Sequence, residues 1–97
     1  MKLLLKPRAE QDLADIWAYI AEKNLPAAER LLSEIEFRLQ LIAETPMLGP
    51  AFPSIAPNLR FFPLKPYLIL YQILPDSIEI VRILDGRRDI PSVITGS

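Results

Sequence analysis

The sequence predicts an α+β domain in which an antiparallel two-helix hairpin packs on an antiparallel sheet, in the order β-α-α-β-β-β. Two amphipathic helical segments occupy about residues 8–45, and three strand-like segments separated by short turn signals occupy residues 59–84. Of the 97 residues, 51% are apolar, which suits one small core. Residues 1–97 are therefore expected to form a single domain.

The first half begins with a short strand and a helix. Leu3–Leu5 is an apolar run between two lysines, and the next residue, Pro7, is one that the first turn of a helix tolerates. A first helix is expected over residues 8–23, with Asp12 and Asp15 facing solvent. The apolar stripe that predicts it consists of Ala9, Leu13, Ile16 and Ile20.

A second helix is expected from Pro26 to near Thr45, because Pro46 stops it there. Its apolar face carries Ala28, Leu32, Ile35, Leu39 and Ile42. The break between the two helices is so short that they must run antiparallel. The following segment, residues 47–58, is rich in proline and is expected to be an ordered loop that crosses back over the domain.

Three strands are expected at Leu59–Leu64, Tyr67–Leu74 and Ser77–Leu84, joined by hairpin turns, with the N-terminal strand at the edge of this meander. The last two strands are apolar on both faces, whereas an antiparallel sheet with one wet face should alternate. The surplus apolar surface indicates either a partner site or cover by the proline-rich loop. In this pattern Arg82 shares a face with Ile78 and Ile80.

The chemistry open to this chain is narrow, because it contains no histidine and no cysteine. Proton shuttles, thiol nucleophiles and transition-metal ligands of the usual kinds are missing, so neither a metal site nor a cofactor is expected. A formal net charge of −1 argues against coating nucleic acid by charge alone. With no cysteine, no secretory core and no membrane-length apolar run, we expect a cytoplasmic protein.

Motifs spread over nearly the whole chain resemble one family. They are Ala9-x-x-Asp12-Leu13-x-x-Ile16-x-x-Tyr19-Ile20, Leu39-x-x-Ile42 before Pro46-x-x-Gly49, Leu59-Arg60, Tyr67-x-Ile69-x-Tyr71, and Val81-Arg82-Ile83-Leu84-x-Gly86-Arg87-Arg88-Asp89-Ile90. Their order and spacing resemble the ParE/RelE superfamily of small toxins from bacterial type II toxin–antitoxin pairs. The family fold, two helices on an antiparallel sheet, agrees with the elements expected from periodicity.

The ending Gly86-Arg87-Arg88-Asp89-Ile90-Pro91 resembles the ParE branch, whose members are described as poisons of DNA gyrase. The resemblance implies a plasmid-stabilising toxin without catalysis of its own, which touches nucleic acid only indirectly and is neutralised by a ParD-like antitoxin of ribbon-helix-helix type. One alternative is a RelE-like, ribosome-dependent messenger RNA endonuclease. Another is a non-toxic relative that only binds its antitoxin, because Asp85 stands where many ParE-like members carry histidine.

Target contact is expected at Arg87 and Arg88, which follow Gly86 in a turn where nothing forces them to pair internally. Arg82 and Arg60 are further candidates, although a structural ion pair, for Arg82 with Asp85 or Asp89, is the alternative. In the nuclease alternative, Arg60, Lys65, Arg82 and Arg87 form a phosphate site. Tyr71 or Tyr67 would then transfer a proton, which requires a strongly lowered pKa.

An antitoxin is expected to lay a short helix or strand, ordered on binding, against apolar surface. Cross-strand packing is the alternative role for the two strand tyrosines, and packing within the hairpin is the alternative for the tryptophan. The residues expected to bind the antitoxin are Trp17, Phe37, Leu41, Ile69 and Tyr71.

Overall fold

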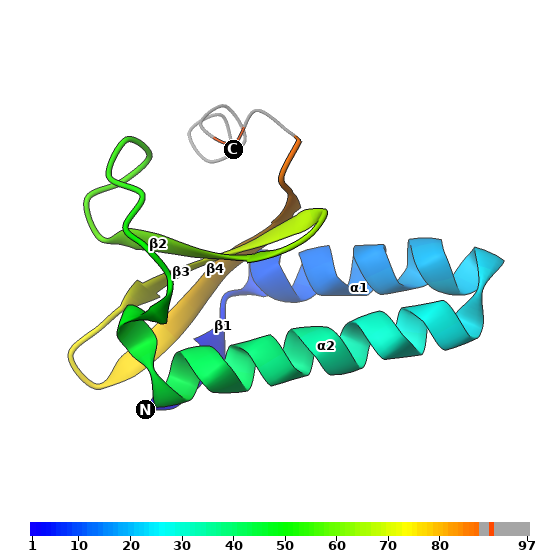
Figure 1. Ribbon diagram of the computed structural model, residues 1–97, viewed down its shortest axis with the longest axis horizontal. Helices are drawn as coiled ribbons and strands as arrows, with labels where there is room; N and C mark the ends of the chain where they lie inside the picture. Colours follow the sequence, from blue (N-terminus) through cyan, green and yellow to red (C-terminus); the bar gives the residue numbers. More distant parts are fainter. Residues whose placement is uncertain (88–89, 91–97) are drawn as a thin grey trace.

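The structure, a computed structural model, describes residues 1–87 and residue 90. It confirms the α+β class, with the helical hairpin lying along one face of the sheet (Figure 1). Where the observed boundaries differ from those predicted, they differ by one residue. The elements are β1 (Lys2–Leu5), α1 (Pro7–Lys23), α2 (Leu25–Glu44), a short 3-10 helix (Pro46–Leu48), β2 (Leu59–Leu64), β3 (Tyr67–Ile73) and β4 (Ser77–Asp85).

One residue, Asn24, both ends α1 and begins α2. Its backbone N–H donates to the carbonyl oxygen of Ile20, and its side-chain oxygen accepts a hydrogen bond of 3.1 Å from the N–H of Ala27. This side chain is the N-cap that satisfies a free donor in the first turn of α2. Helix α2 therefore runs antiparallel to α1 directly after Asn24, as predicted. Neither of them combines the length and the hydropathy needed to cross a membrane, nor does any other described helix.

The strands form one sheet in the order β1-β4-β3-β2. The meander β2-β3-β4 is antiparallel as predicted, but β1 pairs parallel to β4, with Lys2 opposite Ser77 and Leu5 opposite Ile80. The sheet is thus mixed, and the expectation of a wholly antiparallel sheet is corrected for this strand. A short apolar run identifies a strand but carries no information about its direction, and β1 is far in sequence from its partner.

A β-bulge divides β4 into two halves. Leu70 pairs with Arg82 while the next residue, Tyr71, pairs with Ile80, so Val81 is extra in the ladder. The extra residue reverses the side-chain alternation, and Ile83 therefore joins Ile78 and Ile80 in the core beneath the helices. Arg82 shares the register of Leu70 instead, so its expected placement on the face of Ile78 was wrong.

The second face of the sheet has its own apolar cluster, which contains Leu59, Leu70, Leu84 and Ile90. Phe52, Ile55 and Ala56 of the proline-rich loop pack against it, so the loop covers this part of the sheet. The loop also bonds to the edge of β2, where the N–H of Phe61 donates to the carbonyl oxygen of Pro50 at 3.1 Å. Of the two explanations for the surplus apolar surface, cover by the chain's own loop accounts for this face.

Candidate functional site

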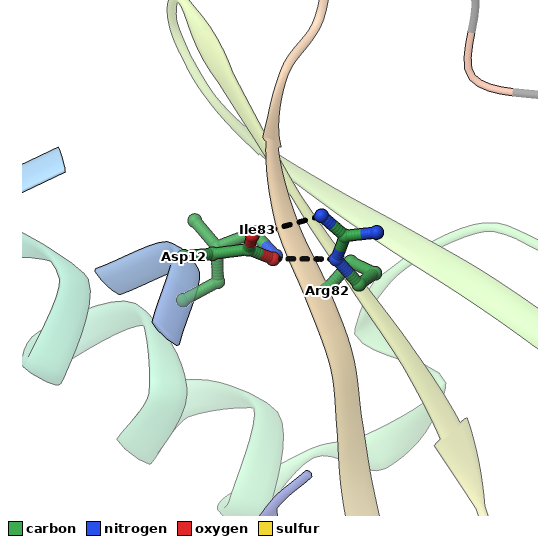
Figure 2. Close-up of polar contacts among 3 residues, drawn as sticks. All are labelled: Asp12, Arg82 and Ile83. Atoms are coloured by element: carbon green, nitrogen blue, oxygen red, sulfur yellow. Dashed lines mark hydrogen bonds and ion pairs between the residues drawn. The ribbon is translucent and has the colours of Figure 1, made fainter. Parts of the chain in front are cut away.

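Arg82 is held by a carboxylate from the other end of the sequence. Its Nε lies 2.7 Å from Oδ2 of Asp12 and its Nη2 lies 2.9 Å from Oδ1, a two-point contact between β4 and α1 (Figure 2). The backbone N–H of Ile83 donates to the same Oδ2 at 3.0 Å. Because β1 pairs with β4 only as far as Ile80, the Asp12 carboxylate takes the place that a further strand residue would occupy.

This buried pair corrects two expectations from the sequence. Only 8% of the Arg82 side chain and 12% of the Asp12 side chain are exposed, so Asp12 is not part of a solvated helix face. The hydrogen bonds that Arg82 donates to Asp12 raise the pKa of Arg82. Arg82 pairs with Asp12 rather than Asp85, and Asp89 lies outside the described residues. A guanidinium that is buried and held at two points is not free to contact a target.

Tyr71 fastens the start of the proline-rich loop to the sheet. Its hydroxyl donates to the carbonyl oxygen of Pro46 at 2.7 Å and accepts from the N–H of Gly49 at 2.8 Å. The Nη1 of Arg60 donates to the carbonyl oxygen of Gly49 at 2.7 Å. A Cβ on Gly49 would clash with the carbonyl oxygen of Phe61 and lie 2.7 Å from the Tyr71 hydroxyl, so the close approach requires glycine.

These contacts separate the residues that the nuclease alternative groups together. Arg82 and Arg60 are committed to Asp12 and to the loop, and Tyr71 is fully buried. Burial raises the pKa of Tyr71, and burial together with Asp85 raises the pKa of Tyr67, so both phenols shift away from the lowered pKa that proton transfer requires. Among the described residues no three carboxylates come together as a metal site.

Arg87 remains at the surface, with 81% of its side chain exposed. Asp85 holds it through three contacts: Arg87 Nη2 to Oδ2 at 2.6 Å, Nε to Oδ1 at 3.0 Å, and backbone N–H to Oδ1 at 2.9 Å. These bonds raise the pKa of Arg87 and fix its orientation. Arg88, the other residue of the expected contact pair, lies outside the described residues.

Beside Arg87 a groove of about 630 Å³ opens between the β2–β3 turn and the end of β4. The N–H of Gly86 donates to the carbonyl oxygen of Pro66 at 2.7 Å, and Tyr67 pairs with Asp85 across the strands, so both walls are fixed by backbone contacts. We call this hollow the basic groove. Its lining residues are Pro63, Lys65, Pro66, Tyr67, Leu68, Gly86 and Arg87.

The residues expected to bind an antitoxin fall into two groups. Ile69 and Tyr71 are fully buried beneath the helices, so they were wrongly placed on a partner surface. Phe37 is 60% exposed, Trp17 is 36% exposed and Leu41 is half-buried. Trp17 lines a separate hollow of about 570 Å³, here called the helix groove. Its lining residues are Leu5, Glu10, Leu13, Ala14, Trp17 and Leu32.

The role of Asp12 was missed, although the sequence carries a signal for it. Asp12 lies three residues after Ala9 and four before Ile16, so it belongs to the apolar row of α1 rather than its wet side. A buried arginine in a strand needs a carboxylate, and Asp12 is the acid on the face that packs on the sheet. The close approach at Gly49 has no comparable signal.

Comparison with known proteins was made on the whole chain. A protein-family model described as the ParE toxin of type II toxin-antitoxin system, parDE, matches residues 3–90. Toxin ParE3 of Caulobacter vibrioides is 32% identical over 80 residues, which cover 81% of this chain and 80% of that protein. Toxin ParE1 of Mycobacterium tuberculosis is 28% identical over 91 residues, which cover 92% and 93%.

A solved structure titled "Chromosomal ParDE TA system from P. aeruginosa" superposes with a TM-score of 0.73. The match covers 86% of this chain and 92% of that chain at 23% sequence identity. At this identity the likeness shows a shared fold.

Proposed function

The chain belongs to the ParE toxin family of type II toxin–antitoxin systems, and on this basis we propose that it inhibits DNA gyrase and is neutralised by a ParD-like antitoxin. The observation that carries the proposal is the family match, which spans residues 3–90 and so includes all the described helices and strands except the first residue of β1. Gyrase is the target that the resemblance to the ParE branch implies.

The geometry supports action by binding rather than by catalysis. Cleavage of RNA without histidine requires clustered cations and a lysine or tyrosine with a strongly lowered pKa. Here Arg82 and Arg60 make internal contacts, and the pKa of Tyr71 is raised. Lys65 and Arg87 line the basic groove without either of those arginines. We infer that the toxin traps gyrase on cleaved DNA and performs no bond chemistry itself.

A supercoiling assay tests the target. The purified chain is added to DNA gyrase, relaxed plasmid and ATP, with and without excess antitoxin. We expect loss of supercoiling and protein-linked cleaved plasmid, both reversed by antitoxin. A folded, antitoxin-free sample that leaves supercoiling intact would contradict the gyrase proposal and direct attention to ribosome-dependent RNA cleavage or to an inactive relative.

The antitoxin is expected to cover exposed apolar side chains of the helical hairpin, with Phe37 as an anchor. The solved ParDE system with the same fold supports a partner of the ParD type. Replacing Phe37 with Ser, alone and together with Leu41→Ser, should weaken antitoxin binding by about tenfold or more. Leu25→Ser, an exposed apolar residue at the start of α2, serves as the matched control in the same titration calorimetry.

A further inference from the structure

The charged residues that line the basic groove have one sign, and the Asp85 carboxylate is paired with one of them. Its two charged lining residues, Lys65 and Arg87, are both cations, and both are exposed. Lys65 makes no hydrogen bond or ion pair within the described part of the chain. Asp85 occupies Nε and Nη2 of Arg87, which leaves the other terminal nitrogen for a partner. A carboxylate entering this groove therefore meets two cations, one of them already oriented.

The floor and walls of the groove are apolar. Pro63, Pro66, Tyr67 and Leu68 line it, and Gly86 lies against this wall, since a Cβ there would lie 3.4 Å from Leu68 Cγ. A concave apolar lining flanked by a few oriented polar groups is typical of a binding site. A volume of about 630 Å³ has room for a short peptide segment rather than for one side chain alone.

The occupant cannot join the sheet as an added strand. Pro63 in β2 has no N–H to offer, and the loop already bonds to this edge at Phe61 and bridges it at Arg60. Nucleic acid is disfavoured as well, because two cations on a chain of net charge −1 provide little phosphate binding. A protein segment with an apolar side chain between carboxylates would match both the apolar lining of the groove and its two cations.

The helix groove offers the contrast. It is also apolar, but the charged residue that lines it is an acid, Glu10. Two hollows of similar size but opposite charge therefore lie on one small domain, and they favour partners of opposite charge. The helix groove contains Trp17, one of the residues expected to bind an antitoxin, whereas the basic groove contains Arg87, expected to contact the target.

From this contrast we propose that the toxin contacts its protein target through the basic groove. The groove binds an acidic segment of that protein in which an apolar side chain lies between carboxylates. This proposal rests on the proposed function, because it deepens the toxin's contact with its target. Of the residues expected to contact the target, the proposal keeps Arg87 and assigns structural roles to Arg60 and Arg82. It adds Lys65 and Tyr67, which line the same groove. Arg88 lies outside the described residues.

The test is charge reversal at the groove, Lys65→Glu together with Arg87→Glu. Both side chains are exposed, so the variant should fold, which a circular dichroism spectrum and a thermal midpoint like those of wild type would verify. Arg30→Glu, an exposed cation on α2, is the matched control. We measure inhibition of gyrase supercoiling and growth arrest on induction in cells. The groove variant should need about tenfold more protein for half-inhibition and should arrest growth weakly, while the control matches wild type.

Each outcome separates this proposal from the gyrase proposal. If the groove variant no longer arrests growth and wild type does not inhibit gyrase, the groove proposal is supported and gyrase is refuted as the target. Growth arrest and inhibition that match wild type overturn the groove. Lost antitoxin affinity, or lost binding of linear DNA by the chain alone, also overturns it, by assigning the groove to another ligand. A wild type that neither arrests growth nor inhibits gyrase overturns both proposals.

Discussion

Two arginine–aspartate pairs, each with one residue on β4, make nearly the same contacts and have opposite consequences. Arg82 and Asp12 are 70 residues apart and almost completely buried, whereas Arg87 and Asp85 are two residues apart and the arginine is 81% exposed. Water screens the second pair and not the first. The comparison teaches that burial and sequence separation, rather than contact distance, determine which arginine supports the fold and which is free for a partner.

The largest effect is expected from Asp12→Ala. The change leaves the Arg82 guanidinium buried without a counter-charge and removes the acceptor for the N–H of Ile83. Breaking a buried pair on one side costs about 3–5 kcal/mol, so the free energy of unfolding should fall by that amount. Urea denaturation followed by circular dichroism measures it.

The double variant Asp12→Leu/Arg82→Met provides the control, because it removes both charges and keeps apolar volume in their place. It should be more stable than Asp12→Ala, since no unpaired charge remains buried. If the single and double variants lose equal stability, the ion pair itself is not what joins α1 to β4.

A smaller loss is expected from Tyr71→Phe, which tests a buried polar contact without charge. The ring stays, but the N–H of Gly49 and the carbonyl oxygen of Pro46 lose their partner. Unsatisfied buried groups of this kind cost about 1–3 kcal/mol. Tyr67→Phe is the matched control, because no hydrogen bond of its hydroxyl is found within the described residues, and it should unfold nearly as wild type does.

The raised pKa of Tyr71 predicts how the stability of the fold changes at alkaline pH. Burial raises the pKa of Tyr71 above its ordinary value of 10.0, so the folded state holds this proton more tightly than the unfolded chain. The stabilisation is complete below pH 10.0, and it declines as pH rises from there through the folded pKa. Unfolding midpoints measured at rising alkaline pH should fall faster for wild type than for Tyr71→Phe. Parallel curves would contradict this assignment.

The smallest effect on stability is expected from Arg87→Ala. The pair it breaks is exposed and local, so the thermal unfolding midpoint should stay within experimental error at physiological salt. Toxicity in cells should fall in the same variant, because the basic groove loses one of its cations. A large drop in the midpoint would show that the exposed pair also stabilises the fold, and so would contradict the difference between the two arginine pairs.

The sequence predicts the elements of this fold well, because helix and strand periodicities are local properties. It predicts neither the direction of β1 nor the bulge at Val81, since both depend on which strands meet across long stretches of chain. The wrong face was predicted for Arg82 because the side-chain alternation of the strand was extended through Val81, where the bulge reverses it. Similarly, Ile69 and Tyr71 were assigned to a partner surface because periodicity does not say which apolar face the helices cover.

The candidate site was predictable only in part. Arg87 in its turn after Gly86 could be selected from sequence, and no element within residues 1–87 buries that turn. Its grouping with Lys65 depends on the hairpin geometry that brings the Pro66 turn against Gly86. Arg60 donates a hydrogen bond to the carbonyl oxygen of Gly49 and so does not belong to the candidate site. A contact to a backbone oxygen cannot be predicted from the pattern of residue types.

The pairing of β1 with β4 has a consequence for synthesis. A ribosome releases β1 and both helices well before β4, yet β1 has no strand partner and Asp12 has no arginine until β4 emerges. Contacts between such distant segments form late and slowly. A half-made chain therefore has no complete sheet and no basic groove, so the surface that we propose for target contact exists only once translation has passed β4.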